Sequence, residues 1–137
     1  MKLRTKPNKD IIIIFIVITI IGIIGILSSF FISDVSIKVL FILLGTTFIL
    51  ASTLLLIGTL TNYEEVDGLI FTVYRIGKKK EIPINKIKSI HFTGVTVMLI
   101  DDTDSIICNI NPKKNNLIPV LKVLEDNGVE YIENIEK

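Results

Sequence analysis

The chain has 137 residues, of which 50% are hydrophobic and 21% are charged, and its formal net charge is +1. Only seven of the charged residues precede residue 61. This segregation predicts a basic segment over residues 1–10, a membrane anchor over 11–60 and a small soluble domain with one core over 61–137. It excludes a large enzyme, a coiled coil and a wholly disordered chain.

Two uncharged runs of equal length follow the basic segment. Ile11–Ile32 and Val39–Leu60 each contain 22 residues, enough for a helix that crosses a hydrocarbon core of about 30 Å. The link over residues 33–38 is so short that the two helices must be antiparallel. We therefore predict a hairpin of two transmembrane helices. Neither run contains an ionisable residue, which argues against an ion path or a proton relay.

The distribution of Lys and Arg predicts the orientation of this hairpin. The first run is preceded by four basic residues, Lys2, Arg4, Lys6 and Lys9, whereas the link contains only Lys38. Basic residues favour the cytoplasmic side, so both termini should be cytoplasmic in a multi-pass protein of the bacterial cytoplasmic (inner) membrane. The alternative for the first run is a secretory signal, but the run exceeds a signal core in length and lacks a small-residue cleavage site.

Small residues recur along one side of each run, and such residues allow helices to approach closely in lipid. The predicted packing residues are Gly22, Gly25 and Ser29 in the first helix and Gly45, Ser52 and Thr59 in the second. A hairpin folded about residues 34–36 places Gly25 opposite Gly45. The alternative interpretation is that small residues are simply common in membrane helices.

Short runs of β-branched and aromatic residues begin at Asn62 and are separated by turn residues. They predict six strands, over residues 62–66, 69–76, 80–84, 87–92, 95–100 and 105–110. Asp67-Gly68 and Gly77-Lys78 predict tight turns between the first three. Pro83 predicts that the third strand lies at a sheet edge or ends there.

One amphipathic helix follows the strands. Its apolar residues recur at helical spacing, at Leu117, Val120, Leu121 and Leu124. Asn115 or Asn116 caps its start, and Pro119 fits only within the first turn. Asn127-Gly128 predicts its end, and residues 129–132 predict a short final strand.

The layout of the whole chain resembles a known family. The residues that carry the resemblance are NYEEVDGLIFTVYRIGKKKEIPINKIKSIHF (62–92), which follow two membrane helices and precede an amphipathic helix. The chain resembles the bacterial PH-like (pleckstrin-homology-like) domain of small membrane proteins. The resemblance implies an α+β domain with a bent antiparallel sheet or half-barrel capped by the C-terminal helix. About six strands are visible, so a seventh would be rudimentary or supplied by residues 129–132.

The domain offers little for enzyme chemistry. His91 is the only histidine and alternates with strand residues, which favours a structural role over a general base. Cys108 lies among isoleucines, which favours a core thiol over a nucleophile. Asp101, Asp102 and Asp104 lack the glycine and the distal glutamate of a calcium loop. We therefore predict no catalytic residue, no metal, no cofactor and no small-molecule substrate.

A basic cluster is the better candidate for a site. It contains Arg75, Lys78, Lys79, Lys80, Lys86 and Lys88. Lysines near an anionic membrane surface contribute on the order of 1 kcal/mol each, so the cluster is predicted to contact lipid or a partner. The alternative is a solvated turn whose lysines protect a sheet edge. Residues 62–137 hold ten Lys or Arg against twelve Asp or Glu, and this balance excludes bulk nucleic-acid binding.

Three functions remain open at this point. The first is a non-enzymatic accessory protein of a membrane assembly, whose PH-like domain binds a protein partner or a second copy of the chain. The second is a membrane protein that responds to anionic lipid. The third is a bacteriocin-type immunity protein, which provides self-protection.

Overall fold

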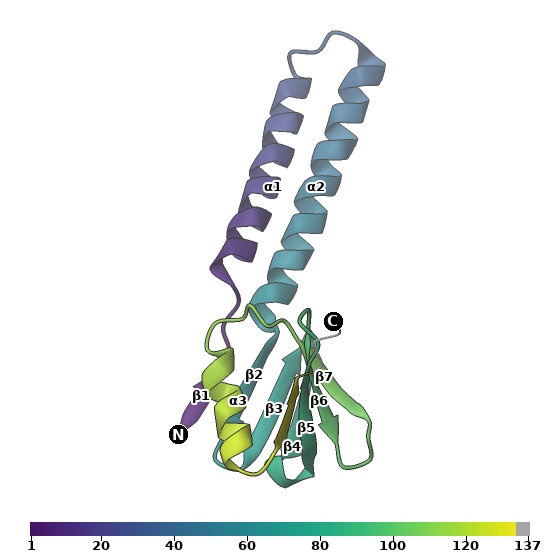
Figure 1. Cartoon of the computed structure of the whole chain (residues 1–137). Coiled ribbons are helices and arrows are strands. Elements are labelled where there is room, and N and C mark those ends of the chain that lie inside the picture. Colours follow the sequence, from purple (N-terminus) through teal and green to yellow (C-terminus); the bar gives the residue numbers. More distant parts are fainter. Residues whose placement is uncertain (134–137) are drawn as a thin grey trace. The chain divides into compact units, whose positions relative to one another are not determined.

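The computed structural model describes residues 1–133 of the chain, which divides into two compact units (Figure 1). The helical unit comprises Lys9–Leu60. The β unit joins Met1–Asn8 to the chain from Thr61 onward. Residues 1–8 therefore belong to the same folded unit as the C-terminal domain, although the sequence predicted a separate basic segment over 1–10.

The helical unit contains α1 (Lys9–Ser29) and α2 (Val35–Thr61), both long and apolar enough to cross a membrane. Helix α2 begins earlier than predicted because Asp34 caps it. The backbone N–H groups of Ser36 and Ile37 donate to Asp34 Oδ1, at 2.9 and 3.1 Å. The link between the helices is therefore residues 30–34, and the last four residues of the predicted link, 35–38, are helical.

The two helices approach most closely at Gly22 and Gly45. A Cβ atom added to Gly22 would lie 2.8 Å from the carbonyl oxygen of Gly45, and one added to Gly45 would lie 2.7 Å from that of Gly22. A Cβ added to Gly25 would meet only the Cα of Gly45, at 4.0 Å. Gly22, not Gly25, is thus the tight partner of Gly45.

The other predicted packing residues differ in their roles. Ser29 and Ser52 are buried, whereas Thr59 is half-buried and its hydroxyl donates to the carbonyl oxygen of Leu55 at 2.8 Å. Ser52 also forms a hydrogen bond between the helices, since its Oγ lies 2.7 Å from Thr19 Oγ1. Thr19 was not among the predicted packing residues, because a threonine in an isoleucine-rich run carries no local signal of its partner.

These contacts predict different effects for substitutions at the three glycines. We expect Gly22→Ala or Gly45→Ala to lower the free energy of unfolding of the helical unit by roughly 1–3 kcal/mol, because the added methyl group would overlap backbone atoms. Gly25→Ala is the matched control and should have little effect. Thermal unfolding of the full chain in detergent measures the difference. Equal melting temperatures for all three variants would contradict the close contact between Gly22 and Gly45.

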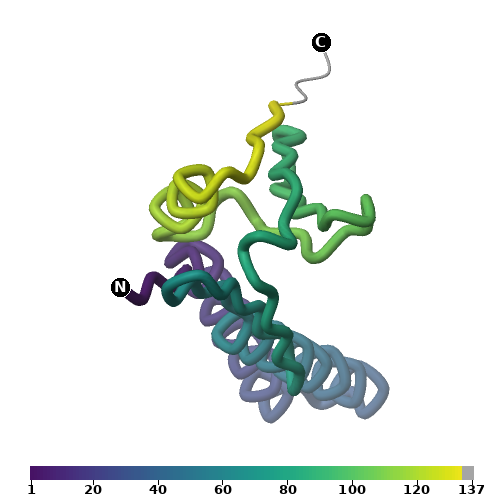
Figure 2. The backbone as a smooth tube through the Cα atoms, turned by 90° about the horizontal axis from the view of Figure 1, so that it is seen from below, coloured from purple at the N-terminus to yellow at the C-terminus, as the bar shows by residue number. Residues whose placement is uncertain are grey.

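The first sheet of the β unit has the order β1-β2-β3-β4 and is antiparallel throughout. Its strands are β1 (Lys2–Arg4), β2 (Tyr63–Asp67), β3 (Ile70–Arg75) and β4 (Lys78–Pro83). Figure 2 shows the N-terminal segment beside β2, as the strand register requires. Strand β1 was not predicted, because three residues of mixed polarity carry no strand signal of their own.

The second sheet has the order β7-β6-β5-β8, and only the β5–β8 pair is parallel. A short 3₁₀ helix, η1 (Ile84–Lys86), connects β4 to this sheet. Its strands are β5 (Ile87–Phe92), β6 (Val97–Asp101), β7 (Ile106–Ile110) and β8 (Glu130–Glu133). Strand β8 confirms the final strand predicted at residues 129–132, within one residue.

Helix α3 (Leu117–Asp126) contributes its predicted apolar stripe to the core of the β unit. Pro119 lies in the first turn, and Gly128 ends the helix with a positive φ of 92°. The stripe packs with inward side chains of both sheets, among them Phe71, Ile90 and Leu99, which are fully buried. The predicted α+β architecture is confirmed at this level, but about six strands was too low a number.

One turn differs from its prediction in a way that matters for the basic cluster. The chain reverses at Ile76-Gly77, where Gly77 has a φ of 69°, and Lys78 already pairs with Arg75. The three consecutive lysines therefore lie in strand β4 and not in the turn. Pro83 is the last residue of that edge strand, as predicted.

Candidate binding groove of the β unit

Two hollows of about 260 and 200 Å³ adjoin β4 and share Lys80 and Ile107. Strand β4 is the edge of the first sheet, and β7 is an edge of the second. We call the two hollows together the β4 groove. The larger is lined by Val73, Arg75, Lys78, Lys80, Ile107, Cys108 and Asn109. The smaller is lined by Lys80, Glu81, Ile82, Pro83, Lys86, Asp101, Asp102 and Ile107.

Alternation along β4 separates the three consecutive lysines. Side chains of a strand point to opposite faces in turn, so Lys78 and Lys80 face the groove with the core residue Ile82. Lys79 faces the other way, where it forms an ion pair with Glu81 and lies 5.7 Å from the ring centre of Tyr74. The hydrogen bond that Lys79 donates to the Glu81 carboxylate raises the pKa of Lys79. Lys78 and Lys80 form no ion pair within residues 1–133.

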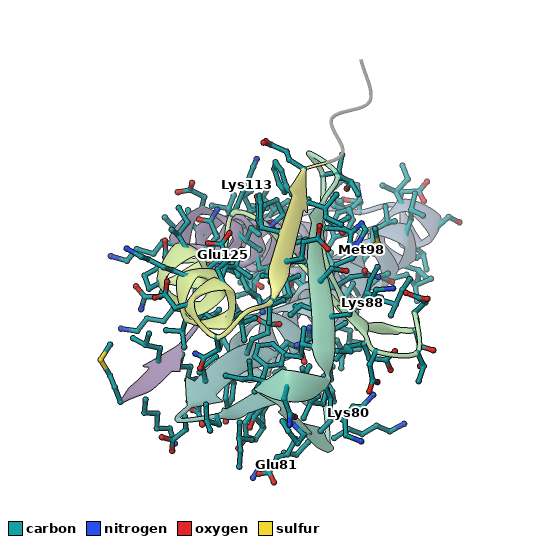
Figure 3. The ribbon with its side chains drawn as sticks, turned by 60° about the horizontal axis from the view of Figure 1, so that its bottom comes forward. Lys80, Glu81, Lys88, Met98, Lys113 and Glu125 are labelled. Atoms are coloured by element: carbon teal, nitrogen blue, oxygen red, sulfur yellow. The ribbon has the colours of Figure 1, made fainter. Side chains whose placement is uncertain are left out.

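The last two residues of the predicted cluster differ in position, because Lys86 lines the β4 groove and Lys88 does not. Lys86 lines the smaller hollow beside Asp101 and Asp102. Lys88 projects from β5 (Figure 3) and donates a hydrogen bond to Asp104 Oδ1 at 2.5 Å. This hydrogen bond raises the pKa of Lys88. The structure thus brings Arg75, Lys78 and Lys80 together in the larger hollow and Lys80 and Lys86 in the smaller one. It does not form one continuous surface of six basic side chains.

Arg75 is positioned by a buried glutamate that the sequence analysis did not single out. Glu64 is 0% exposed, and its carboxylate lies 2.7 Å from the Arg75 guanidinium and 2.9 Å from Lys114 Nζ. Thr5 completes the arrangement, because its hydroxyl donates to Glu64 Oε2 at 2.7 Å. A buried carboxylate needs such partners, since an unpaired charge in the core is costly. Four separate segments of the chain therefore meet at Glu64.

The alternation of inward and outward side chains along β2 could have identified Glu64 as a buried residue. Side chains two residues apart lie on the same face of a strand, so the buried Val66 places Glu64 on the inner face. Glu65 lies on the opposite face and pairs with Lys2 at 3.1 Å. An acidic residue on the inner face of a strand requires a cationic partner, but the sequence does not say which one.

Aromatic and cationic side chains form a row across the outer face of the first sheet. The Arg4 guanidinium lies 3.3 Å from the ring centre of Tyr63. Tyr63 stacks on Tyr74 with ring centres 4.1 Å apart, and Lys79 follows. The row joins all four strands, so Lys79 has a structural partner that explains its position outside the groove.

The acidic residues after β6 form a folded turn. Asp101 Oδ1 accepts hydrogen bonds from the backbone N–H groups of Thr103 and Ser105, both at 2.9 Å, and from the Thr103 hydroxyl at 2.7 Å. These hydrogen bonds lower the pKa of Asp101, and the bond from the Thr103 hydroxyl has the largest effect. Among the described residues no group of His, Cys, Asp or Glu side chains is arranged to hold a metal ion.

His91 and Cys108 have partners or surroundings that suit structural roles. The Nε2 atom of His91 lies 2.9 Å from the hydroxyl of Ser89. Cys108 is buried, and burial together with the negative charge of Glu64 raises the pKa of its thiol to about 12. A thiol with so high a pKa is protonated at neutral pH and is a poor nucleophile.

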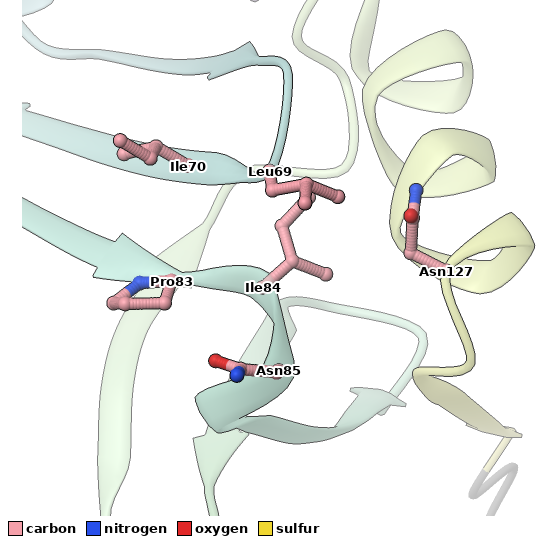
Figure 4. Close-up of a pocket in the computed structure, with 6 residues that line it drawn as sticks. All are labelled: Leu69, Ile70, Pro83, Ile84, Asn85 and Asn127. Atoms are coloured by element: carbon pink, nitrogen blue, oxygen red, sulfur yellow. The ribbon is translucent and has the colours of Figure 1, made fainter.

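A further hollow of about 320 Å³ lies elsewhere on the β unit (Figure 4). Leu69, Ile70, Pro83, Ile84, Asn85 and Asn127 line it. Leu69 and Ile84 point toward one another there, and Asn127 faces them from the end of α3. None of the lining residues is titratable, so the hollow lacks a group for acid–base chemistry.

Comparisons of the chain with protein-family models, with curated proteins and with solved structures give no significant match. The geometry of the β4 groove and the pairing of β1 with β2 are therefore the observations that bear on function.

Proposed function

We propose that this chain is a non-enzymatic integral membrane protein whose PH-like domain binds a protein partner. In this proposal α1 and α2 cross a bacterial cytoplasmic membrane as a hairpin, and the β unit lies on the cytoplasmic side. The chain acts as an accessory subunit of a membrane assembly.

One observation carries the membrane arrangement. Strand β1 precedes the helical hairpin in sequence, and it pairs with β2, which follows the hairpin. Segments that form one sheet must lie on the same side of a membrane, so the intervening chain crosses it an even number of times. Two long apolar helices satisfy this requirement. Cleavage of α1 as a signal would remove β1 and Thr5 from the β unit, which argues against the secretory alternative.

The charges favour the cytoplasmic side for the β unit. The folded segment before α1 contributes Lys2, Arg4 and Lys6, whereas the link between the helices is followed only by Lys38. Lys and Arg near membrane helices favour the cytoplasm. Because β1 pairs with β2, the whole β unit lies on the same side of the membrane as the segment before α1.

The strand order supports the PH-like part of the proposal. The resemblance calls for seven strands and a closing helix, and residues 2–4 supply the strand that was missing from the sequence after Asn62. In this interpretation the hairpin is an insertion between the first and second strands of the domain. Binding is favoured over catalysis because His91, Cys108 and Asp101 are held in structural contacts.

Cysteine labelling tests this arrangement with the native Cys108 left in place, since a buried thiol with a pKa of about 12 should not react. In cells, we expect a membrane-impermeant maleimide to label Ser33→Cys but not Glu125→Cys, because the link faces outward and α3 lies in the cytoplasm. Permeabilisation should make the second position reactive. Labelling of Glu125→Cys in intact cells would overturn the orientation.

A further inference from the structure

We propose that the β4 groove binds an extended acidic segment of a partner protein, which adds as a strand to the free edge of β4. This inference rests on the proposed function and names the chemistry of the partner. It follows from the position of β4 in the sheet, from the direction of its backbone groups and from the charges along the groove.

The backbone of β4 has unused hydrogen-bonding positions. Arg75 and Lys78 flank a two-residue turn and pair with each other. In such a hairpin the flanking residues exchange both backbone hydrogen bonds, and every second pair does so. The N–H and C=O groups of Lys79 and Glu81 must therefore point away from β3. Because β4 is the last strand of its sheet, these groups face the open edge, where an extended peptide can pair with them.

The side chains of the groove define what that peptide should carry. Val73, Ile107 and Cys108 supply apolar surface. Lys78 and Lys80 lie two residues apart on the face that lines the groove, so their Cα atoms are about 7 Å apart. A strand paired with β4 places its own alternate side chains at the same spacing. Acidic residues at positions i and i+2 of the peptide would thus meet the two lysines.

The charges in the groove favour an anionic ligand. Lys78 and Lys80 form no ion pair within residues 1–133, although the charge of Lys80 contributes to lowering the pKa of Asp101. Arg75, in contrast, already shares the buried carboxylate of Glu64 with Lys114. The excess positive charge therefore lies at the two lysines that face the hollow. Asp101 and Asp102 lie in the smaller hollow beside Lys86, so the acidic residues of the peptide should occupy the Arg75 end.

A peptide suits this geometry better than a lipid surface. Membrane binding through charge requires several basic side chains that reach one plane. Here Lys79 lies on the opposite face of β4 with Glu81, and Lys88 is paired with Asp104. The remaining lysines, Lys78, Lys80 and Lys86, line a concave groove, which accommodates a chain and not a flat bilayer.

Binding of a synthetic peptide to the full-length protein in neutral detergent tests the inference. The probe is a fluorescein-labelled octapeptide with glutamate and valine in alternation, and the matched probe has glutamine in place of each glutamate. Fluorescence anisotropy should show binding of the first probe that weakens with salt. The double substitution Lys78→Gln and Lys80→Gln should weaken binding roughly tenfold or more, as expected for loss of two charge-assisted contacts. Lys79→Gln is the control and should bind as the wild type does.

A second measurement tests strand addition separately from charge. Two further probes carry N-methyl groups on alternate backbone nitrogens of the glutamate peptide, one at every glutamate and the other at every valine. Methylation removes N–H groups and leaves the charges unchanged. We expect one of the two methylated peptides to lose binding and the other to retain it, because only alternate N–H groups of an added strand face β4.

The inference would be overturned by equal binding of the glutamate and glutamine probes, or by equal effects of the Lys79 and Lys78/Lys80 substitutions. Binding of the wild-type protein to anionic vesicles that the Lys78/Lys80 double substitution abolishes, together with no peptide binding at all, would overturn it in favour of lipid. The proposed function fails differently, through the labelling pattern of positions 33 and 125. A correct orientation without peptide binding would leave the membrane arrangement standing and remove only the groove as the acidic-segment site.

Discussion

A protein in which residues 9–60 are replaced by a flexible linker should fold as a soluble β unit, whereas residues 61–137 alone should be much less stable. The reason is that β1 lies before the hairpin in sequence but belongs to the first sheet. Without residues 1–8 the β unit loses the packing of Leu3 and the buried hydroxyl of Thr5. Loss of a buried hydrogen-bond partner costs about 1–3 kcal/mol, so we expect a total loss of about 3 kcal/mol or more.

Urea unfolding followed by circular dichroism measures this difference. A Gly/Ser linker of about ten residues has a root-mean-square span of about 17 Å, enough to join neighbouring chain ends without strain. The control is the linked protein with Thr5→Val, which keeps β1 but removes the hydroxyl that bonds to Glu64. Equal stability of residues 61–137 with and without the N-terminal segment would show that β1 is dispensable and would weaken the membrane argument built on it.

Substitution of Glu64 by Gln should also have a large effect on the full chain. It would remove the charge that compensates Lys114 and Arg75, whose side chains are only 14% and 33% exposed. Removal of one partner from a buried ion pair typically costs about 3–5 kcal/mol. We expect the lower part of this range, because Arg75 can turn partly toward solvent.

Glu65→Gln is the matched control for this prediction. Glu65 is the next residue of the same strand, and its side chain is 9% exposed, but the side chain of its partner Lys2 is 64% exposed. Lys2 therefore stays hydrated when the pair is lost, and we expect Glu65→Gln to cost no more than about 1 kcal/mol. Thermal unfolding of the full chain in detergent should therefore show a much larger decrease for Glu64→Gln. Similar decreases for both variants would mean that the buried pair does not hold the four segments together.

Most secondary structure of this chain follows from local signals in the sequence. Long uncharged runs predicted α1 and α2, and helical spacing with Asn127-Gly128 predicted α3 and its end. Strands bounded by Gly turns were predicted to within a few residues, because a turn at Gly68 or Gly77 depends only on its own residues. Residues 134–137 of the predicted domain lie outside the described part of the chain.

Tertiary structure decided the features that depend on distant pairs of residues. Strand β1 exists because Leu3 and Thr5 find partners on β2, some sixty residues away. The contact of Gly45 with Gly22 instead of Gly25 depends on the rotation of two helices, which the spacing of small residues does not specify. In both cases the sequence shows which residue types are suited to a contact but not which partner they meet.

The basic residues illustrate the same division most clearly. The sequence determined that Arg75, Lys78, Lys79, Lys80, Lys86 and Lys88 are close together along the chain. Only the sheet register placed Lys78 and Lys80 in the β4 groove and Lys79 behind it, and only the fold brought Asp104 to Lys88 and Glu64 to Arg75. The physical reason is that charge is a property of the residue, whereas neutralisation of that charge requires a neighbour that the fold supplies.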